Sequence, residues 1–309
     1  MNYIVEGWVD AERHSSDISQ ERYAEVKEAR DRCLVAVEIE EKFQLLLENY
    51  NEFEVDLLRI AERVVISSHE GHDVSMTQRL LLDRRIANLL TACRLFLDQT
   101  AHSVSSQFGA KSPEFLRLKR FKNDCYDKTS GYRIMEELRN HVQHAGLLVH
   151  IITYSHFTVE CDGNRYPVTA IIPHSRTSDL CAKGKIKASV LKDLNAEGND
   201  VDLRQPIREY LSCMVQLHGE LRAMFAERIK IAHETFRTAT NEFTKIDGVE
   251  VKYPSLATVD SGGRLSESVY LGKEMLVYYD ELVRRNKVAD QLERRSAANL
   301  YVRKTLRVE

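Results

Sequence analysis

Helical periodicity over long stretches is the feature that most constrains the fold of this chain. From residue 20 to 67, apolar residues recur at helical spacing among Glu, Lys, Arg and Ala, and a second such pattern runs from 76 to 107. Only 5 Pro and 13 Gly interrupt the 309 residues. Because helix breakers are so scarce, we expect a mainly helical protein whose first two long helices form an antiparallel pair.

Further helices are predicted at 113–126, 132–152, 206–243 and 274–301. The helix at 113–126 has a clear start, because Ser112 can cap it and Pro113 occupies the favoured first position. We interpret the basic end of the chain, 284–307, as part of a solvated helix because acidic residues dilute its charge.

A β-hairpin is the main departure from helical character. Two β-rich runs, 157–161 and 165–172, flank the turn sequence Asp162-Gly163-Asn164. Pro167 places its strand at a sheet edge or at a bulge. A weak strand pattern covers 185–191, and short β-like runs lie within 247–271.

We therefore expect four parts in a mainly α fold. These are an N-terminal segment (1–19), a helical core (20–155 and 203–246), a small β-hairpin insertion (156–202) and a C-terminal helical extension (247–309).

Charge and cysteine usage limit the class of protein. The net charge of −3 excludes a protein that is basic overall, so any surface for nucleic acid must be a local patch. The six cysteines are scattered without a Cys-x-x-Cys pair, which suits reduced thiols in a cytoplasm.

The first ten residues do not resemble a secretory signal, and the longest apolar stretch, 146–154, is far shorter than the roughly 20 residues of a membrane span. We expect a cytoplasmic protein without a membrane segment.

The predicted helix around residues 132–146 separates into two faces. One face is apolar and should pack on the other helices; it comprises Ile134, Met135, Leu138, Val142 and Ala145. The opposite face is polar; it comprises Arg133, Glu136, Glu137, Arg139, Asn140, Gln143 and His144. Asn140 and His144 share a side of the helix at i and i+4, whereas Arg139 lies about 140° around from His144. Arg139 must therefore swing its long side chain toward His144, so one chain alone makes an imperfect site. Either the β-hairpin or a second subunit is expected to cover this helix.

The segment Arg139-Asn140-His141-Val142-Gln143-His144 resembles the Arg-x-x-x-x-His signature of HEPN domains (higher eukaryotes and prokaryotes nucleotide-binding). Residues 132–144 also resemble a segment of uncharacterised bacterial proteins of that superfamily. The resemblance implies a HEPN-like helical bundle that forms a homodimer and cleaves RNA without a metal or other cofactor. It further implies a role in antiviral defence or as a toxin, with an antitoxin or regulatory protein as an additional partner.

The residue types suit that chemistry. His144 is the candidate general acid or base, because an imidazole accepts or donates a proton near neutral pH. Arg139 is expected to hold the phosphate with its fork of donors, and Asn140 to orient either group. Glu137, about 20° from His144 on the helix, and His141 are expected to support the site.

Two other clusters carry candidate functional residues. Residues expected to contact RNA are Arg117, Lys119, Arg120, Lys122 and Phe121, since basic groups among aromatics suit phosphate contact and base stacking; the alternative is an ordinary charged helix face. The cluster at residues 69–73 (His-Glu-Gly-His-Asp) lacks the helical His-Glu-x-x-His order, so we expect no metal there. No phosphate-binding Gly-rich loop and no Ser or Cys nucleophile motif is present.

A rival hypothesis belongs to a different class of protein. The same polar face would then serve a non-catalytic helical interaction or RNA-binding protein that dimerises through this helix.

Overall fold

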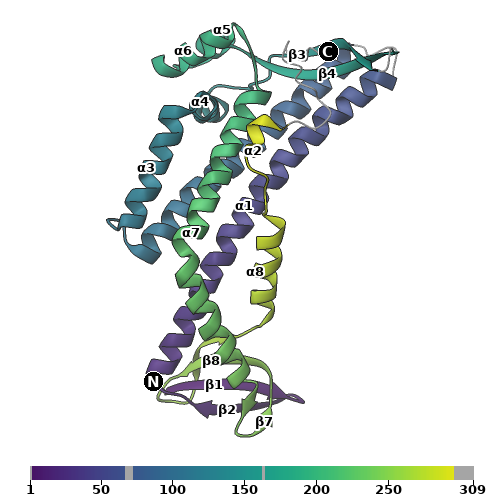
Figure 1. The fold of residues 1–309 in the computed structure, drawn as a ribbon. Coiled ribbons are helices and arrows are strands. Elements are labelled where there is room, and N and C mark those ends of the chain that lie inside the picture. Colours follow the sequence, from purple (N-terminus) through teal and green to yellow (C-terminus); the bar gives the residue numbers. More distant parts are fainter. Residues whose placement is uncertain (1, 67–71, 162–163, 296–309) are drawn as a thin grey trace. The chain divides into compact units, whose positions relative to one another are not determined.

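The computed structural model describes residues 2–66, 72–161 and 164–295 (Figure 1). The described chain is mainly helical, as predicted. Its helices are α1 (Gln20–Ile66), α2 (His72–Phe108), α3 (Pro113–Lys128), α4 (Ser130–His144), α5 (Thr177–Lys183), α6 (Ala188–Glu197), α7 (Arg204–Glu242), α8 (Glu274–Arg285) and the short 3-10 helix η1 (Leu292–Arg294). Its strands are β1 (Asn2–Val9), β2 (Glu12–Asp17), β3 (Ile151–Cys161), β4 (Asn164–Arg176), β5 (Asp200–Asp202), β6 (Lys245–Ile246), β7 (Val249–Glu250), β8 (Lys252–Val259) and β9 (Leu265–Tyr270).

The chain divides into two compact units. The first unit comprises residues 1–44 and 221–287, and the second comprises 45–220 and 288–309. The long helices α1 and α7 each contribute to both units.

In the first unit, an antiparallel sheet of order β2-β1-β8-β9 packs on helical segments. Its core is apolar and includes Val5, Val26, Phe236, Leu256 and Val269. Buried Glu40 accepts two 2.8 Å hydrogen bonds from Arg222 and one from the Asn286 side chain at the end of α8. A charge this deeply buried is tolerated because hydrogen bonds and an ion pair compensate for its lost hydration.

The second unit holds the predicted motif. Figure 1 shows the second half of α1 and α2 running side by side in opposite directions, so the expected antiparallel pair is confirmed. The core of the second unit is built from fully buried apolar side chains of several helices, among them Leu46, Phe53, Leu57, Leu82, Ile86, Phe96, Met135, Leu138, Ile207 and Tyr210.

The predicted hairpin of the second unit is confirmed, and it is longer than expected. Strands β3 and β4 pair from Ile151↔His174 to Cys161↔Asn164, while residues 162–163 of the predicted turn lie outside the described part. The short strand β5 pairs only with 174–176 of β4. Pro167 lies on the stretch of β4 that has β3 as its described neighbour, which agrees with the predicted edge position.

Three predicted elements differ in the structure. The helix expected at 274–301 ends at Arg285 as α8, and the described residues beyond it hold only the short helix η1. The weak strand expected at 185–191 is wrong, because 188–197 forms helix α6 and buries Val190 and Leu194 at i and i+4. The helix expected to run to 152 ends at His144, where the N–H groups of Ala145 and Gly146 both donate to the His141 carbonyl. The backbone of 148–149 then donates to buried Asp83, so a tertiary partner ends the helix.

Candidate functional site on helix α4

Helix α4 begins in close contact with α7. A Cβ atom on Gly131 would lie 2.6 Å from Glu209 Oε2 and 2.9 Å from the Pro206 carbonyl oxygen, so a larger residue cannot fit without a shift. The Gly131 N–H donates to Glu209 Oε2 at 2.9 Å. This carboxylate satisfies a free N–H group in the first turn of the helix.

The first polar residues of α4 anchor the helix. Arg133 forms a bidentate ion pair with Asp193 of α6, at 2.7 and 3.1 Å, and donates to the Tyr126 carbonyl at the end of α3. Glu136 accepts a 2.5 Å hydrogen bond from the buried Tyr210 hydroxyl. Both side chains were expected on the free polar face. They instead fix α4 between α3, α6 and α7, and Figure 1 shows α4 lying between α3 and the α5–α6 pair.

The motif residues lie on the second half of α4. Arg139 Nη2 donates to Asn140 Oδ1 at 2.6 Å, so the guanidinium reaches toward the side of the helix that carries Asn140. Arg139 Nε is buried and has no hydrogen-bond partner among the described residues. Asn140 is half-buried, while His144, one turn further along, is exposed in the last turn. The arrangement leaves donors of Arg139 and the His144 ring available to a ligand.

Glu137 occupies a different position from the one expected of a group supporting His144. Its side chain is buried, and it accepts from the backbone N–H of Lys187 at 3.3 Å while its other oxygen lies 3.7 Å from Lys187 Nζ. Among the described residues Glu137 therefore pairs with Lys187 and makes no hydrogen bond to His144. It attaches the α5–α6 connection to α4.

His141 is buried with only 4% of its surface exposed, and neither ring nitrogen has a described hydrogen-bond partner. Gly184 packs against it, since a Cβ there would lie 3.4 Å from His141 Nδ1. Burial lowers the pKa of His141, and nearby Lys183 lowers it further. His150 has a similar environment: its Nδ1 accepts from the Arg176 N–H at 3.0 Å, and its Nε2 is buried without a described partner.

We expect these two histidines to make the second unit less stable in mild acid. Burial lowers the pKa of both, and for His150 the positive charges of Lys183 and Arg176 act in the same direction while Asp179 opposes them. The unfolded chain, with a histidine pKa of about 6.5, then binds protons first. The free energy of unfolding is therefore highest above about pH 6.5 and falls as the pH drops toward the lowered folded-state pKa values.

Urea unfolding of wild type and the His141→Gln variant, followed between about pH 7.5 and pH 5, tests this expectation. The variant should lose less stability over the acid range than wild type. The His102→Gln variant serves as the control, because His102 is exposed, and it should follow the wild-type profile. Identical profiles for wild type and His141→Gln would contradict the prediction.

The residues predicted to contact RNA on α3 do not form one free face. Arg117 makes an ion pair with Glu220 at 2.5 Å, and half-buried Phe121 lines a cleft against α7. Lys119 and Arg120 are exposed, and Lys122 is half-buried. The structure therefore brings none of these side chains into hydrogen-bond contact with Arg139, Asn140 or His144.

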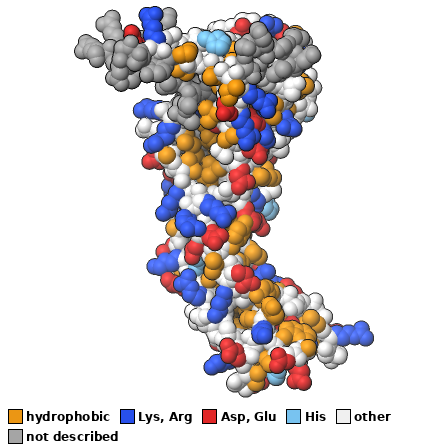
Figure 2. Space-filling view, turned by 90° about the vertical axis from the view of Figure 1, so that its right-hand side faces the viewer, with side chains coloured by type: hydrophobic (Ala, Val, Ile, Leu, Met, Phe, Trp, Pro, Cys, Tyr) orange, Lys and Arg blue, Asp and Glu red, His pale blue; other side chains and the backbone are white. Residues whose placement is uncertain are grey.

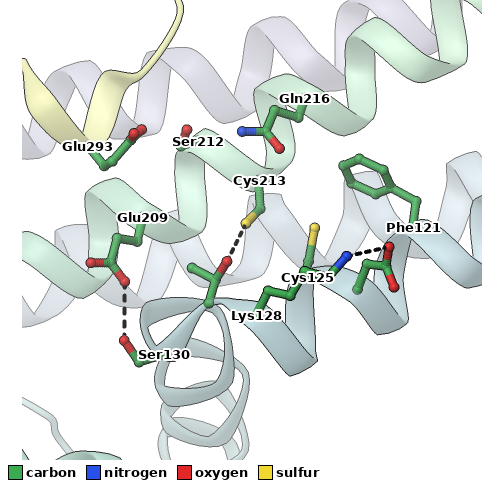
Figure 3. Close-up of a pocket in the computed structure, with 11 residues that line it drawn as sticks. Phe121, Cys125, Lys128, Ser130, Glu209, Ser212, Cys213, Gln216 and Glu293 are labelled. Carbon is green, nitrogen blue, oxygen red and sulfur yellow. Dashed lines mark hydrogen bonds and ion pairs between the residues drawn. The ribbon is translucent and has the colours of Figure 1, made fainter.

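A cleft of about 480 Å³ separates α3 from α7, away from the motif residues (Figure 3). Figure 3 shows Phe121, Cys125 and Lys128 on one wall and Glu209, Cys213 and Gln216 on the other. Cys213 donates to Thr129 Oγ1 at 3.8 Å. A hydrogen bond to Cys213, together with burial, raises the pKa of the Cys125 thiol, which disfavours a reactive thiolate at that position.

The remaining sequence expectations concern the cluster at 69–73, metal-binding groups and membrane-spanning helices. The His-Glu-Gly-His-Asp cluster at 69–73 falls largely outside the described residues. Within the described ranges, no group of three or more His, Cys, Asp or Glu side chains is placed to hold a metal ion. The described helices also include none that is both long and apolar enough to span a membrane.

Residues 183–187 (Lys-Gly-Lys-Ile-Lys) were not among the predicted site residues, and part of this segment was predicted as a weak strand. The structure places this segment against α4, through the contacts of Lys187 with Glu137 and of Gly184 with His141. A signal was present in the sequence, because three lysines alternate within five residues.

Comparisons of the chain with protein-family models, with curated proteins and with solved structures yield no significant match. The resemblance to HEPN domains therefore rests on the motif of α4 and the helical character of the chain.

Proposed function

We propose that this chain is a HEPN-like, metal-independent endoribonuclease that acts as a homodimer through Arg139, Asn140 and His144. The observation that carries the proposal is the 2.6 Å hydrogen bond from Arg139 Nη2 to Asn140 Oδ1. Asn140 and His144 lie one helical turn apart on the same side of α4. The contact therefore turns the guanidinium toward the side that carries His144, which is the movement that a shared site requires.

The proposed reaction is transesterification within the RNA strand. The ribose 2′-oxygen attacks the adjacent phosphorus, forming the O2′–P bond while the P–O5′ bond breaks. His144 takes the proton of the 2′-hydroxyl as general base, and the protonated imidazole of the second copy gives a proton to the 5′-oxygen. Arg139 stabilises the charge that builds on the phosphate oxygens. The products are a 2′,3′-cyclic phosphate and a 5′-hydroxyl.

A second copy fits the distribution of polar residues on α4. Arg133, Glu136 and Glu137 are used in contacts within the chain, whereas Gln143 and His144 are exposed at the end of the helix. In the proposed homodimer, the exposed ends of two α4 helices meet and supply two copies of each motif residue. A role in bacterial antiviral defence or in a toxin system is the biological setting that the resemblance implies.

Incubation of the purified protein with end-labelled single-stranded RNA in the presence of a chelator tests the proposal. The expected products carry cyclic phosphate and 5′-hydroxyl ends. An absence of cleavage for all RNAs tested, with RNA still bound, would favour the rival RNA-binding function. Cleavage that stops in chelator would contradict the metal-independent chemistry.

A further inference from the structure

The region from α5 to the middle of α6 carries an unusual concentration of positive charge. Residues 176–192 contain five basic side chains, Arg176, Lys183, Lys185, Lys187 and Lys192, and a single acidic one, Asp179. The net charge of these residues is +4, in a chain whose net charge is −3. By contrast, the face drawn in Figure 2 shows basic and acidic side chains mixed in small groups.

This basic segment lies directly against the motif helix. Lys187 is held to α4 by Glu137, and its ammonium group lies 5.8 Å from the centre of the Tyr126 ring. At the end of α4, a Cβ atom on Gly146 would lie 3.8 Å from Lys183 Nζ. Gly146 is two residues beyond His144, so the Lys183 ammonium lies close to the end of the helix that presents the candidate base.

The lysines of this segment differ from the basic residues of α3 in their position, because Lys183 lies beside the end of α4. Lys183 and Lys185 are exposed and make no ion pair with described residues. Lys187 is paired with Glu137 but keeps 61% of its side chain exposed. On α3, Arg117 pairs with Glu220, whereas Lys119 and Arg120 are exposed like the lysines of this segment but have no described contact with the motif residues. Unpaired, exposed ammonium groups attract phosphates most strongly, because no protein carboxylate competes for them.

We infer that Lys183 and Lys185 bind the phosphate backbone of single-stranded RNA and guide the strand to the end of α4. This inference rests on the proposed function for its substrate, and it replaces α3 by the α5–α6 connection as the main RNA-binding surface. Lys187 positions the connection through Glu137 while its ammonium adds to the local positive charge. The contacts are electrostatic, so they carry no base specificity.

Binding of a short fluorescent single-stranded RNA, measured by anisotropy over a range of salt concentrations, tests the inference. All variants are made in a His144→Ala background, so that the RNA is not cut during the measurement. The Lys183→Ala/Lys185→Ala variant is compared with the matched Lys119→Ala/Arg120→Ala variant, which removes the same charge from exposed positions on α3.

In the Lys183→Ala/Lys185→Ala variant, the loss of two phosphate contacts should make the plot of log affinity against log salt less steep by about 1.4. This change corresponds to about 25-fold weaker RNA binding than the parent near 0.1 M salt. The α3 variant should bind within about twofold of the parent, since it removes no proposed phosphate contact. Equal affinity of the Lys183→Ala/Lys185→Ala variant and the parent would overturn the inference, even if wild type cleaves RNA. Weaker binding by that variant would support the inference, even if wild type cuts no RNA, in which case the endoribonuclease proposal alone fails.

A second readout leaves the lysines in place. Cys181 is exposed on α5, two residues before Lys183. In a Cys161→Ser background, bound RNA should slow the reaction of Cys181 with a maleimide, measured by peptide mass spectrometry. An unchanged Cys181 rate at saturating RNA would contradict the proposed surface.

Discussion

Replacing His144 with Ala is expected to slow RNA cleavage by about 10²–10⁴-fold, the usual contribution of a general acid or base. The His144 side chain is exposed and makes no described hydrogen bond, so its removal should leave the thermal unfolding temperature close to that of wild type. Loss of activity without loss of stability would identify a chemical role. The rate of cleavage of end-labelled RNA under single-turnover conditions provides the measurement.

Two further variants define the chemistry of the site. Arg139→Ala should lose activity to a similar degree, and Arg139→Lys should recover little of it because an ammonium group lacks the planar fork of donors. His102→Ala is the control, since His102 is an exposed histidine on α2 with no proposed role in the reaction or in the dimer. Full activity in His144→Ala would remove the imidazole from the mechanism.

Replacing Arg208 with Ala is expected to destabilise the second unit by about 3–5 kcal/mol, because it leaves the largely buried carboxylate of Glu54, whose side chain is 16% exposed, without its partner. Arg208 of α7 donates to both oxygens of Glu54 in α1, at 2.8 and 2.9 Å, and keeps only 4% of its side chain exposed. Glu54 also accepts from the Tyr50 hydroxyl at 2.8 Å. Urea unfolding followed by circular dichroism measures the loss.

The control for this prediction is an exposed ion pair, which also joins a basic and an acidic side chain. Lys128 and Asp124 form an ion pair in α3 whose side chains are 73% and 62% exposed. Lys128→Ala should therefore cost no more than about 0.5 kcal/mol. The double variant Arg208→Met/Glu54→Met should recover much of the stability lost in Arg208→Ala, although the Tyr50 hydroxyl then loses its acceptor. A loss below about 1 kcal/mol in Arg208→Ala would contradict this account of the buried pair.

The elements predicted from the sequence are those with strong local signals. The start of α3 follows from Ser112, whose Oγ accepts from the Phe115 N–H, and from Pro113 in the first turn. The β3–β4 hairpin follows from its turn residues and β-rich flanks. Such features depend on neighbours within a few residues, so no knowledge of the tertiary fold is needed.

The elements that were missed depend on distant partners or on unusual turns. Strands β1 and β2 are joined at Asp10 and Ala11, which adopt positive φ angles without the Gly or Asn that normally signals such a turn. The end of α4 at His144 depends on Asp83, which accepts hydrogen bonds from the backbone 65 residues further along the chain. No local pattern in the sequence reports such a contact.

Some features of the candidate site could likewise be predicted from local sequence, and others depend on distant partners. Sequence spacing predicted that Arg139 must swing toward His144. In the structure Arg139 donates to Asn140, and no contact with His144 is described. The pairing of Glu137 with Lys187, 50 residues away in the sequence, and the burial of His141 beneath Gly184 could not be predicted, because both depend on where the α5–α6 connection packs. That packing also places Lys183 next to the end of the motif helix.

Disulfide cross-linking between two copies of the chain is the most direct test of the central claim, that two α4 helices meet to form one site. A Gln143→Cys variant, in a background with Cys161 and Cys181 replaced by Ser, should form a covalent dimer under mild oxidation, and the matched Lys119→Cys variant should not. If both cysteine variants stay monomeric, or if only the Lys119→Cys variant forms a covalent dimer, the ends of α4 do not meet. Either result would contradict the composite site.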